Sequence, residues 1–304
     1  MTGNYWDLTN KPQTKIKLKI LNDYLSAWAK IFAKQEYCEK LYYVDCFAGR
    51  GKYNNEQQKD AINGSPLIAL DIARNISVNY HKKITCFFIE KDPITFKDLQ
   101  KFVAPFETHA KAFLEKGDVN LKIDDILAQI PSKRWCPIFF FIDPGGIDIK
   151  KESIEKMLDR PNIKEFLIIY IQKGVERCLG FGSKANKLPV DIRTRAITNL
   201  RRVEDFFGTS WKGLTKNERD NLKKYLNTFV EYNERVLEKD KLAFKGIDIL
   251  YNQGRNKYYL IFISRNKNAL SIIDDIYRKT KVDGTLFASL PTIEKKKIYR
   301  FDID

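Results

Sequence analysis

The sequence predicts an α/β protein with a Rossmann-like, mostly parallel sheet of seven strands and helices on both faces. Two observations carry this prediction. Short apolar segments of strand length alternate along the chain with segments of helical periodicity. Several of these apolar segments also end in an acidic or glycine-rich turn, as expected where parallel strands deliver loops to one edge of a sheet. We expect one domain over residues 1–304, with a helical insertion at 180–245.

The expected helices and strands of the first half alternate regularly. Residues 14–34 carry apolar side chains at three- and four-residue spacing, which predicts a helix with one buried face. Ser65 and Pro66 suit the N-cap and first residue of a second helix, and Pro93–Val103 predicts a third. We expect residues 52–64 to form a loop. The expected strands are Leu41–Asp45, Ile84–Ile89, Val119–Ile123, Ile138–Ile142 and Phe166–Gln172, with a helix through Ile130 after the third.

The pattern changes after the fifth expected strand. Residues 180–245 show no convincing strand and are rich in basic side chains, which favours helices at 191–207 and 216–238. Beyond them we expect strands at Ile247–Tyr251 and Tyr258–Ser264, a helix at 268–280 and a last short strand at Ile298–Phe301.

The chain is strongly basic. Its 54 Lys and Arg against 39 Asp and Glu give a formal net charge of +15 and a pI near 9.4. Such an excess attracts polyanions, which favours nucleic acid as a partner ahead of an anionic membrane surface. The alternative is that a lysine-rich composition serves solubility alone.

Cysteine and histidine usage argues against a metal site. The five cysteines form no CxxC pair and there are only two histidines, so the usual zinc ligand clusters are missing. The cysteines are expected to be reduced and mostly buried. No apolar run approaches the ~20 residues of a membrane span, and the first residues lack the apolar core of a secretory signal. We therefore expect a cytoplasmic protein without metal or membrane.

The turn after the first expected strand carries the sharpest signal. In Val44–Gly51, the glycines Gly49 and Gly51 let the backbone approach a ligand closely. The segment is neither a GxGxxG fingerprint nor a P-loop. Its D-x-F-A-G-x-G form, from Asp45 through Phe47 to Gly51, resembles the first motif of class I S-adenosylmethionine-dependent methyltransferases. That resemblance implies that the glycine backbone and Asp45 hold the amino-acid end of the cofactor. A tight strand–loop turn without ligand is the alternative.

Acidic residues also follow the next two expected strands. Glu90 ends the second, where a carboxylate can accept hydrogen bonds from both ribose hydroxyls of a nucleoside. Asp124, or its neighbour Asp125, ends the third, where an acid commonly meets the adenine amino group. The alternatives are a solvated acid for Glu90 and a helix N-cap for Asp124.

Asp143-Pro144-Gly145-Gly146 follows the fourth expected strand, beside the first. It resembles the [DN]-P-P-[YF] motif of amino-methyltransferases that act on nucleic acid bases, in which the acid and the following carbonyl accept hydrogen bonds from the attacking amine. No aromatic residue follows here, which weakens the case for a flipped-base aminomethylase. A strand-terminating turn is the alternative.

Basic residues after the fifth strand are candidates for substrate contacts. Arg177 follows the fifth expected strand and could hold a phosphate or another acidic group. In the insertion, basic residues with aromatic residues nearby suit a nucleic-acid surface: Lys184, Lys187, Arg193, Arg195, Arg201 and Arg202. The alternative is a solvated loop and solvated helix faces.

Five blocks, taken in order, resemble the three-Cys-motif partner family. They are TKIKLKILNDYLSAWAKIF (14–32), YVDCFAGRGKY (43–53), GSPLIAL (64–70), FFFIDPGG (139–146) and YYLIFISRNKNAL (258–270). The resemblance implies a class I methyltransferase fold with an S-adenosylmethionine pocket, and a separately encoded three-cysteine protein as partner. The expected function is methyl transfer to nucleic acid, with Asp143 and Pro144 at the reacting group. A non-catalytic nucleic-acid- or partner-binding module is the alternative, and a small-molecule methyltransferase is a third, which the basic charge disfavours.

Overall fold

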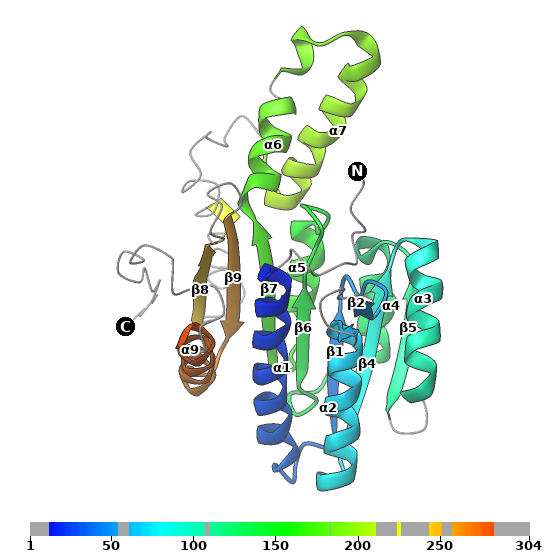
Figure 1. The fold of residues 1–304 in the computed structure, drawn as a ribbon, viewed down its shortest axis with the longest axis vertical. Coiled ribbons are helices and arrows are strands. Elements are labelled where there is room, and N and C mark those ends of the chain that lie inside the picture. The colour runs from blue at the N-terminus through cyan, green and yellow to red at the C-terminus, as the bar shows by residue number, and fades with distance from the viewer. Residues whose placement is uncertain are drawn as a thin grey trace.

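A mixed seven-stranded sheet forms the middle layer of the computed structural model, which describes residues 12–53, 61–106, 110–182, 184–210, 224–225, 243–250 and 257–282 (Figure 1). The strand order is β5-β4-β1-β6-β7-β9-β8. In chain order the strands are β1 (Lys40–Asp45), β4 (Lys83–Glu90), β5 (Lys111–Lys116), β6 (Ile138–Ile142), β7 (Lys164–Ile171), β8 (Ala243–Leu250) and β9 (Lys257–Ser264). A separate two-stranded pair joins β2 (Lys52–Tyr53) to β3 (Ile62–Asn63) within the expected loop.

The sheet is parallel except at one strand. The pairs among β5, β4, β1, β6 and β7 are all parallel, whereas β9 runs antiparallel to both of its neighbours, β7 and β8. The chain leaves β1 towards β4 and β5, then returns to the other side of β1 as β6. This reversal makes the β1–β6 seam the topological switch point, where open α/β sheets bind their ligands. The Rossmann-like, mostly parallel sheet of seven strands is confirmed.

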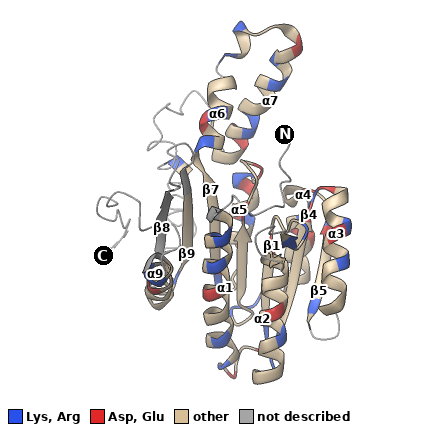
Figure 2. Cartoon of the chain, viewed as in Figure 1, with Lys and Arg blue, Asp and Glu red and all other residues tan. Residues whose placement is uncertain are grey.

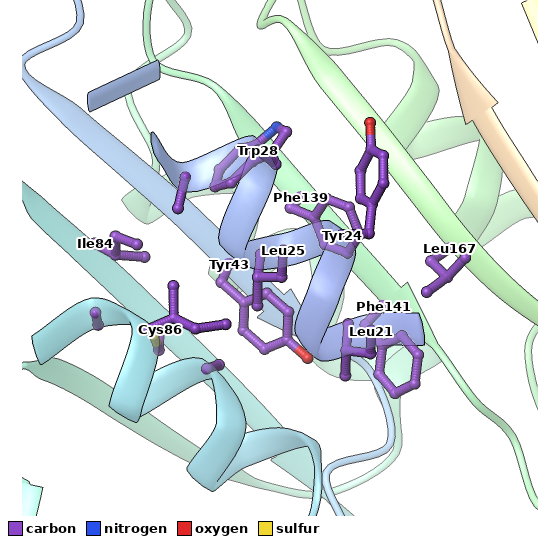
Figure 3. Close-up of a cluster of buried hydrophobic side chains, with 14 of the residues drawn as sticks. Leu21, Tyr24, Leu25, Trp28, Tyr43, Ile84, Cys86, Phe139, Phe141 and Leu167 are labelled. Carbon is purple, nitrogen blue, oxygen red and sulfur yellow. The ribbon is translucent and has the colours of Figure 1, made fainter. Parts of the chain in front are cut away.

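Helices cover both faces of the sheet. One face is covered by α1 (Pro12–Ala33), α2 (Ser65–Tyr80), α3 (Pro93–Val103) and α9 (Lys267–Val282). The other is covered by α4 (Val119–Gln129), α5 (Lys151–Leu158) and part of α7 (Val190–Phe207). Because both faces are buried, β1 and β6 read as nearly continuous apolar runs. Figure 3 shows Leu21, Tyr24 and Trp28 of α1 packed over Tyr43 and Phe139 of the sheet.

The segment after β7 is helical, and its first helix lies at residues where the sequence predicted none. α6 (Gln172–Gly182) runs directly out of β7, and a short 3₁₀ turn (Ala185–Lys187) leads into α7. The two helices form a hairpin that projects beyond the sheet (Figure 1). Gly182 permits their close approach, since a Cβ there would lie 3.0 Å from Leu200 Cβ and 3.2 Å from the Ala196 carbonyl oxygen. Arg177 lies on α6, so the alternative of a solvated loop is wrong for this residue.

The third expected strand is wrong. Val119–Ile123 belongs to α4, whose apolar residues Val119, Ile123 and Ile126 recur at helical spacing and are buried. Asp118 is the N-cap that precedes the helix, and its carboxylate accepts a hydrogen bond from Asn120 N. The true third strand is β5, an edge strand whose apolar centre is only half buried. Ser65 is likewise the first residue of α2, after Gly64 as N-cap.

Some expectations lie outside the described residues. Of the helix expected at 216–238, only Lys224 and Tyr225 are described, and both are helical. The strand expected at Ile298–Phe301 is not among them. Within the ranges that the structure covers, no helix is long and apolar enough to cross a membrane.

Candidate functional site

The carboxyl end of β1 holds a fully buried acid. Asp45 has no solvent exposure and accepts hydrogen bonds from Phe47 N at 3.2 Å and from the Tyr43 hydroxyl at 3.3 Å. Burial raises its pKa to about 7, and the nearby Asp143 carboxylate adds to the rise, while hydrogen bonds from Ser65, Phe47 and Tyr43 oppose it. A group with this pKa can take up or release its proton near neutral pH when a charged ligand arrives.

The turn after Asp45 has the backbone that its glycines predict. Gly49 and Gly51 have φ values of 64° and 91°, which favour glycine. Two backbone bonds fix the turn: Ala48 N donates to the Ile89 carbonyl at 2.9 Å, and Gly64 N donates to the Gly51 carbonyl at 2.7 Å. Phe47 is half-buried against the core on the α4 side.

Glu90 connects this turn to the end of β4. Its Oε2 accepts a hydrogen bond from Gly49 N at 2.9 Å, and its Oε1 accepts one from Asp92 N at 2.7 Å. Burial raises its pKa, while the backbone donors of Asp92, Gly49 and Lys91 lower it. A carboxylate has about four lone-pair sites on its two oxygens, so Glu90 can still accept from the hydroxyls of a ligand. The structure thus places Glu90 against the glycine turn, as expected from its position at the end of a strand.

Asp143 follows β6 on the other side of β1. Asp45 lies opposite Phe141 in the β1–β6 pair, so Asp143 comes two residues beyond it at the switch point. Its Oδ2 contacts the ammonium of Lys17 on α1, and the two side chains are 16% and 17% exposed. Pro144 is buried. Beside it, a Cβ placed on Gly145 would meet nothing within 4 Å, so the chain leaves space there.

Asp124 does not lie with these residues. It is on α4, 59% exposed, and pairs with Lys156 at 2.8 Å, because the segment expected to be a strand is a helix. The acid that follows the third strand is Asp118, which caps α4 and pairs with Lys91 at 2.9 Å. The dipeptide Gly117-Asp118 before a helical pattern was the signal for this position.

The basic residues of the hairpin point to solvent for the most part. Arg177, Arg193 and Arg195 are all exposed, and the Arg193 guanidinium donates to the Leu188 carbonyl at 3.3 Å. Figure 2 shows several Lys and Arg positions as blue segments of the ribbon along α6 and α7. They are not brought into contact with Asp45 or Asp143 in the described structure.

The hairpin is tied to the loop that follows Asp143. Arg202 of α7 pairs with Asp148, and Lys150 pairs with Asp205 at 3.4 Å. Arg202 also lies 3.7 Å from where a Cβ of Gly146 would be. Sequence reasoning did not single out Lys17 or Asp118 as site residues, and it placed Arg202 among the basic residues of a nucleic-acid surface. Nothing in the local pattern of these residues marks the distant partner that each contacts.

The cysteines are free, and four of the five are buried: Cys38, Cys46, Cys86 and Cys178. Within the described ranges, no group of three or more His, Cys, Asp or Glu side chains is arranged to hold a metal ion.

Comparison with known proteins gives similarity to solved methyltransferase structures. No protein-family model and no curated protein matches the chain. Among solved structures, it is similar to the O-methyltransferase TomG of Streptomyces achromogenes in complex with SAM, at 8% identity, 80% and 78% coverage of this and that chain, and a TM-score of 0.37. It is also similar to a fibrillarin pre-rRNA processing protein of Methanococcus jannaschii, at 12% identity, 77% and 70% coverage, and a TM-score of 0.37.

A third similar structure is a precorrin-6y C5,15-methyltransferase of Geobacter metallireducens, at 11% identity, 78% and 87% coverage, and a TM-score of 0.32. Identities this low assign no functional residue of this chain.

Proposed function

We propose that the chain is an S-adenosylmethionine-dependent methyltransferase that acts on nucleic acid. The observation that carries this proposal is the join of three ligand-type groups at the switch point: the buried acid Asp45, the positive-φ turn through Gly49 and Gly51, and the carboxylate of Glu90 that touches that turn. This is where an open α/β sheet binds a nucleotide-like ligand.

The residues present fit this cofactor. Asp45 is a buried acid suited to an ammonium group, and the glycine turn offers backbone without side chains in the way. Glu90 can accept from both hydroxyls of a ribose. Asp118, in place of Asp124, supplies an acid after the third strand for the adenine amino group. When bound, S-adenosylmethionine supplies a methyl group on a sulfonium.

Asp143 is the group that we assign to the methyl acceptor. Its Oδ2 contacts Lys17, and its Oδ1 can accept a hydrogen bond from an N–H or O–H of the substrate and so orient the nucleophile. In-line transfer gains much of its rate from such orientation. The space beside Gly145 would let a substrate approach.

Nucleic acid as the substrate is supported by charge. The net charge is +15, and Arg193, Arg195 and Arg201 are exposed on the projecting hairpin. Exposed cations of this kind bind phosphates without regard to base sequence. The resemblance to the three-Cys-motif partner family adds a separately encoded three-cysteine protein as a proposed partner, and the proposed location is the cytoplasm.

The test is transfer of label from methyl-labelled S-adenosylmethionine to total cellular RNA, DNA and protein. We expect label in a nucleic acid fraction, and at least about tenfold less with Asp143→Ala, the loss of one or two hydrogen bonds to a charged group. Label in protein or in small molecules alone would contradict the nucleic-acid target. Cofactor binding without transfer to any fraction would instead favour a non-catalytic binding module.

A further inference from the structure

Helix α1 carries a lysine on the side that faces the sheet. Lys17 lies one turn before Leu21 and two turns before Tyr24, both of which are buried against the sheet. Figure 3 shows Leu21 and Tyr24 directed at strand residues such as Phe141 and Phe139. Lys17 itself is only 17% exposed on its side chain and reaches Asp143, 126 residues away in the sequence. The packing of α1 therefore fixes an ammonium group at the carboxyl edge of the sheet.

This ammonium lies beside two carboxylates. Asp45 ends β1 and Asp143 follows the neighbouring strand β6, and the two are close enough that the charge of Asp143 adds to the effect of burial on Asp45. With both acids ionised, the three groups sum to one negative charge. S-adenosylmethionine has a sulfonium, an ammonium and a carboxylate, which sum to one positive charge. The two sets are complementary in net charge, and each charged group of one set can pair with an opposite charge of the other.

We propose that Lys17 binds the α-carboxylate of the cofactor, while Asp45 holds its α-ammonium. The inference rests on the proposed function and adds a cofactor-binding residue to it. An ammonium has three N–H donors, and contact with Asp143 Oδ2 takes one of them. Low exposure strengthens the interaction of a second carboxylate with the same ammonium, because less water screens it. Lys17 thus joins the cofactor to Asp143, the group assigned to the substrate.

A purely structural role makes a different prediction. If Lys17 only neutralises Asp143, its removal changes the binding of every ligand in the same way, whether or not the ligand carries a carboxylate. If Lys17 binds the carboxylate, its removal affects only ligands that have one. A pair of ligands that differ in this group alone separates the two roles.

The experiment titrates the full chain by calorimetry with S-adenosylhomocysteine and with S-adenosyl-3-thiopropylamine, its decarboxylated analogue. We expect the wild type to prefer S-adenosylhomocysteine by about tenfold or more, the range of a hydrogen-bonded charge pair. Lys17→Met should reduce this preference to within about threefold, by weakening S-adenosylhomocysteine and not the analogue. Lys17→Arg, which keeps the cation, should restore part of it.

The matched control is Lys19→Met. It removes the same charge from the same helix, but Lys19 pairs with Asp23 at 2.7 Å, and we expect the wild-type preference to persist. Equal affinity of the wild type for both ligands would overturn the inference without any variant. The inference can therefore be tested even if Lys17→Met folds poorly. An undiminished preference in Lys17→Met would overturn it as well. Failure of the wild type to bind either ligand would instead refute the proposed function.

Discussion

At the scale of single residues, burial sets the protonation equilibrium of Asp45. Its raised pKa of about 7 means that the free protein carries this acid largely protonated below neutral pH. An ammonium ligand binds the ionised form, so ligand binding must displace the proton. The proposed site therefore couples the affinity for an ammonium ligand to pH.

The predicted result is weaker binding of S-adenosylhomocysteine as the pH falls below about 7, approaching tenfold per pH unit, with uptake of a proton by the buffer. Calorimetry in two buffers of different ionisation enthalpy measures that proton. Asp45→Asn should bind more weakly and lose the pH dependence. An affinity that stays flat from pH 6 to 8 in the wild type would contradict the assignment of Asp45 to the ammonium.

Asp118 has one observed role and one proposed role, and the two can be separated. It caps α4 through Asn120 N, and we assign it to the adenine amino group. Asp118→Asn keeps a good N-cap but loses the charge, whereas Asp118→Ala loses both and should cost about 1 kcal/mol of unfolding free energy. We expect both variants to bind S-adenosylhomocysteine more weakly and only the alanine variant to unfold more easily. Unchanged binding in both would remove Asp118 from the site.

At the scale of elements, a buried acid links α1, β7 and β9. It lies near the amino-terminal end of β7, away from the strand ends that form the proposed site. Glu165 accepts hydrogen bonds from the Tyr24 hydroxyl at 2.6 Å and from the Ser264 hydroxyl at 2.9 Å. Burial raises its pKa to about 7, although both hydrogen bonds lower it. The folded state therefore binds more protons than the unfolded state between about pH 4.5 and 7.

The sign of the effect on stability follows from this difference. The free energy of unfolding should fall as pH rises through this window, by up to about 3 kcal/mol from Glu165. Glu165→Gln can still accept a hydrogen bond from Tyr24. It should lose the contribution of Glu165 to the pH dependence of the free energy of unfolding, while the contribution of Asp45 remains. Denaturant unfolding at several pH values measures it, with the exposed Glu152→Gln as control. A slope equal to that of the wild type would show that Glu165 is ionised in the folded protein.

The hairpin of α6 and α7 is the element assigned to nucleic acid. Reversal of Arg193, Arg195 and Arg201 to Glu should reduce affinity for nucleic acid and flatten the log–log salt dependence by roughly 0.7–0.9 for each phosphate that the variant no longer binds. Arg202 stays unchanged, because it pairs with Asp148 and its reversal would disturb the loop after Asp143. Affinity for S-adenosylhomocysteine should be retained.

The control for this prediction reverses three exposed lysines elsewhere: Lys83, Lys97 and Lys133. It makes the same change in net charge, so a specific surface on the hairpin requires a smaller loss in the control. If nucleic acid affinity drops equally in both variants, net charge alone explains the binding. If the hairpin variant binds nucleic acid as tightly as the wild type, the hairpin is not the binding surface.

At the scale of the whole molecule, the central strands could be predicted because burial on both faces makes them apolar runs. β1, β4 and β6 each end near an acid, and this pattern located Asp45, Glu90 and Asp143. The edge strand β5 was not predicted, because only three apolar residues lie between Lys111 and Glu115. The next element, α4, is richer in apolar side chains and was taken for the strand. Because of this error, the acid after the third strand was expected at Asp124, whereas the structure places Asp118 there.

Contacts between distant segments could not be predicted in this way. Lys17 is one of several lysines in α1, and only the direction of the helix against the sheet distinguishes it from Lys19, which pairs within its own helix. The same holds for Arg202, which sits in a basic stretch of sequence with exposed arginines and instead holds the base of the hairpin. Local sequence carries the strand ends, whereas the packing of helices decides which cations reach them.

The measurement that tests the central claim most directly is calorimetric titration of the wild type, Glu90→Ala and Asp124→Ala with S-adenosylhomocysteine. We predict one binding site in the wild type, affinity about 10–100-fold lower in Glu90→Ala because the hydrogen bonds to its carboxylate are removed, and wild-type affinity in Asp124→Ala, whose side chain faces solvent beside Lys156. No binding by the wild type, or equal binding by Glu90→Ala, would contradict a cofactor site at the switch point.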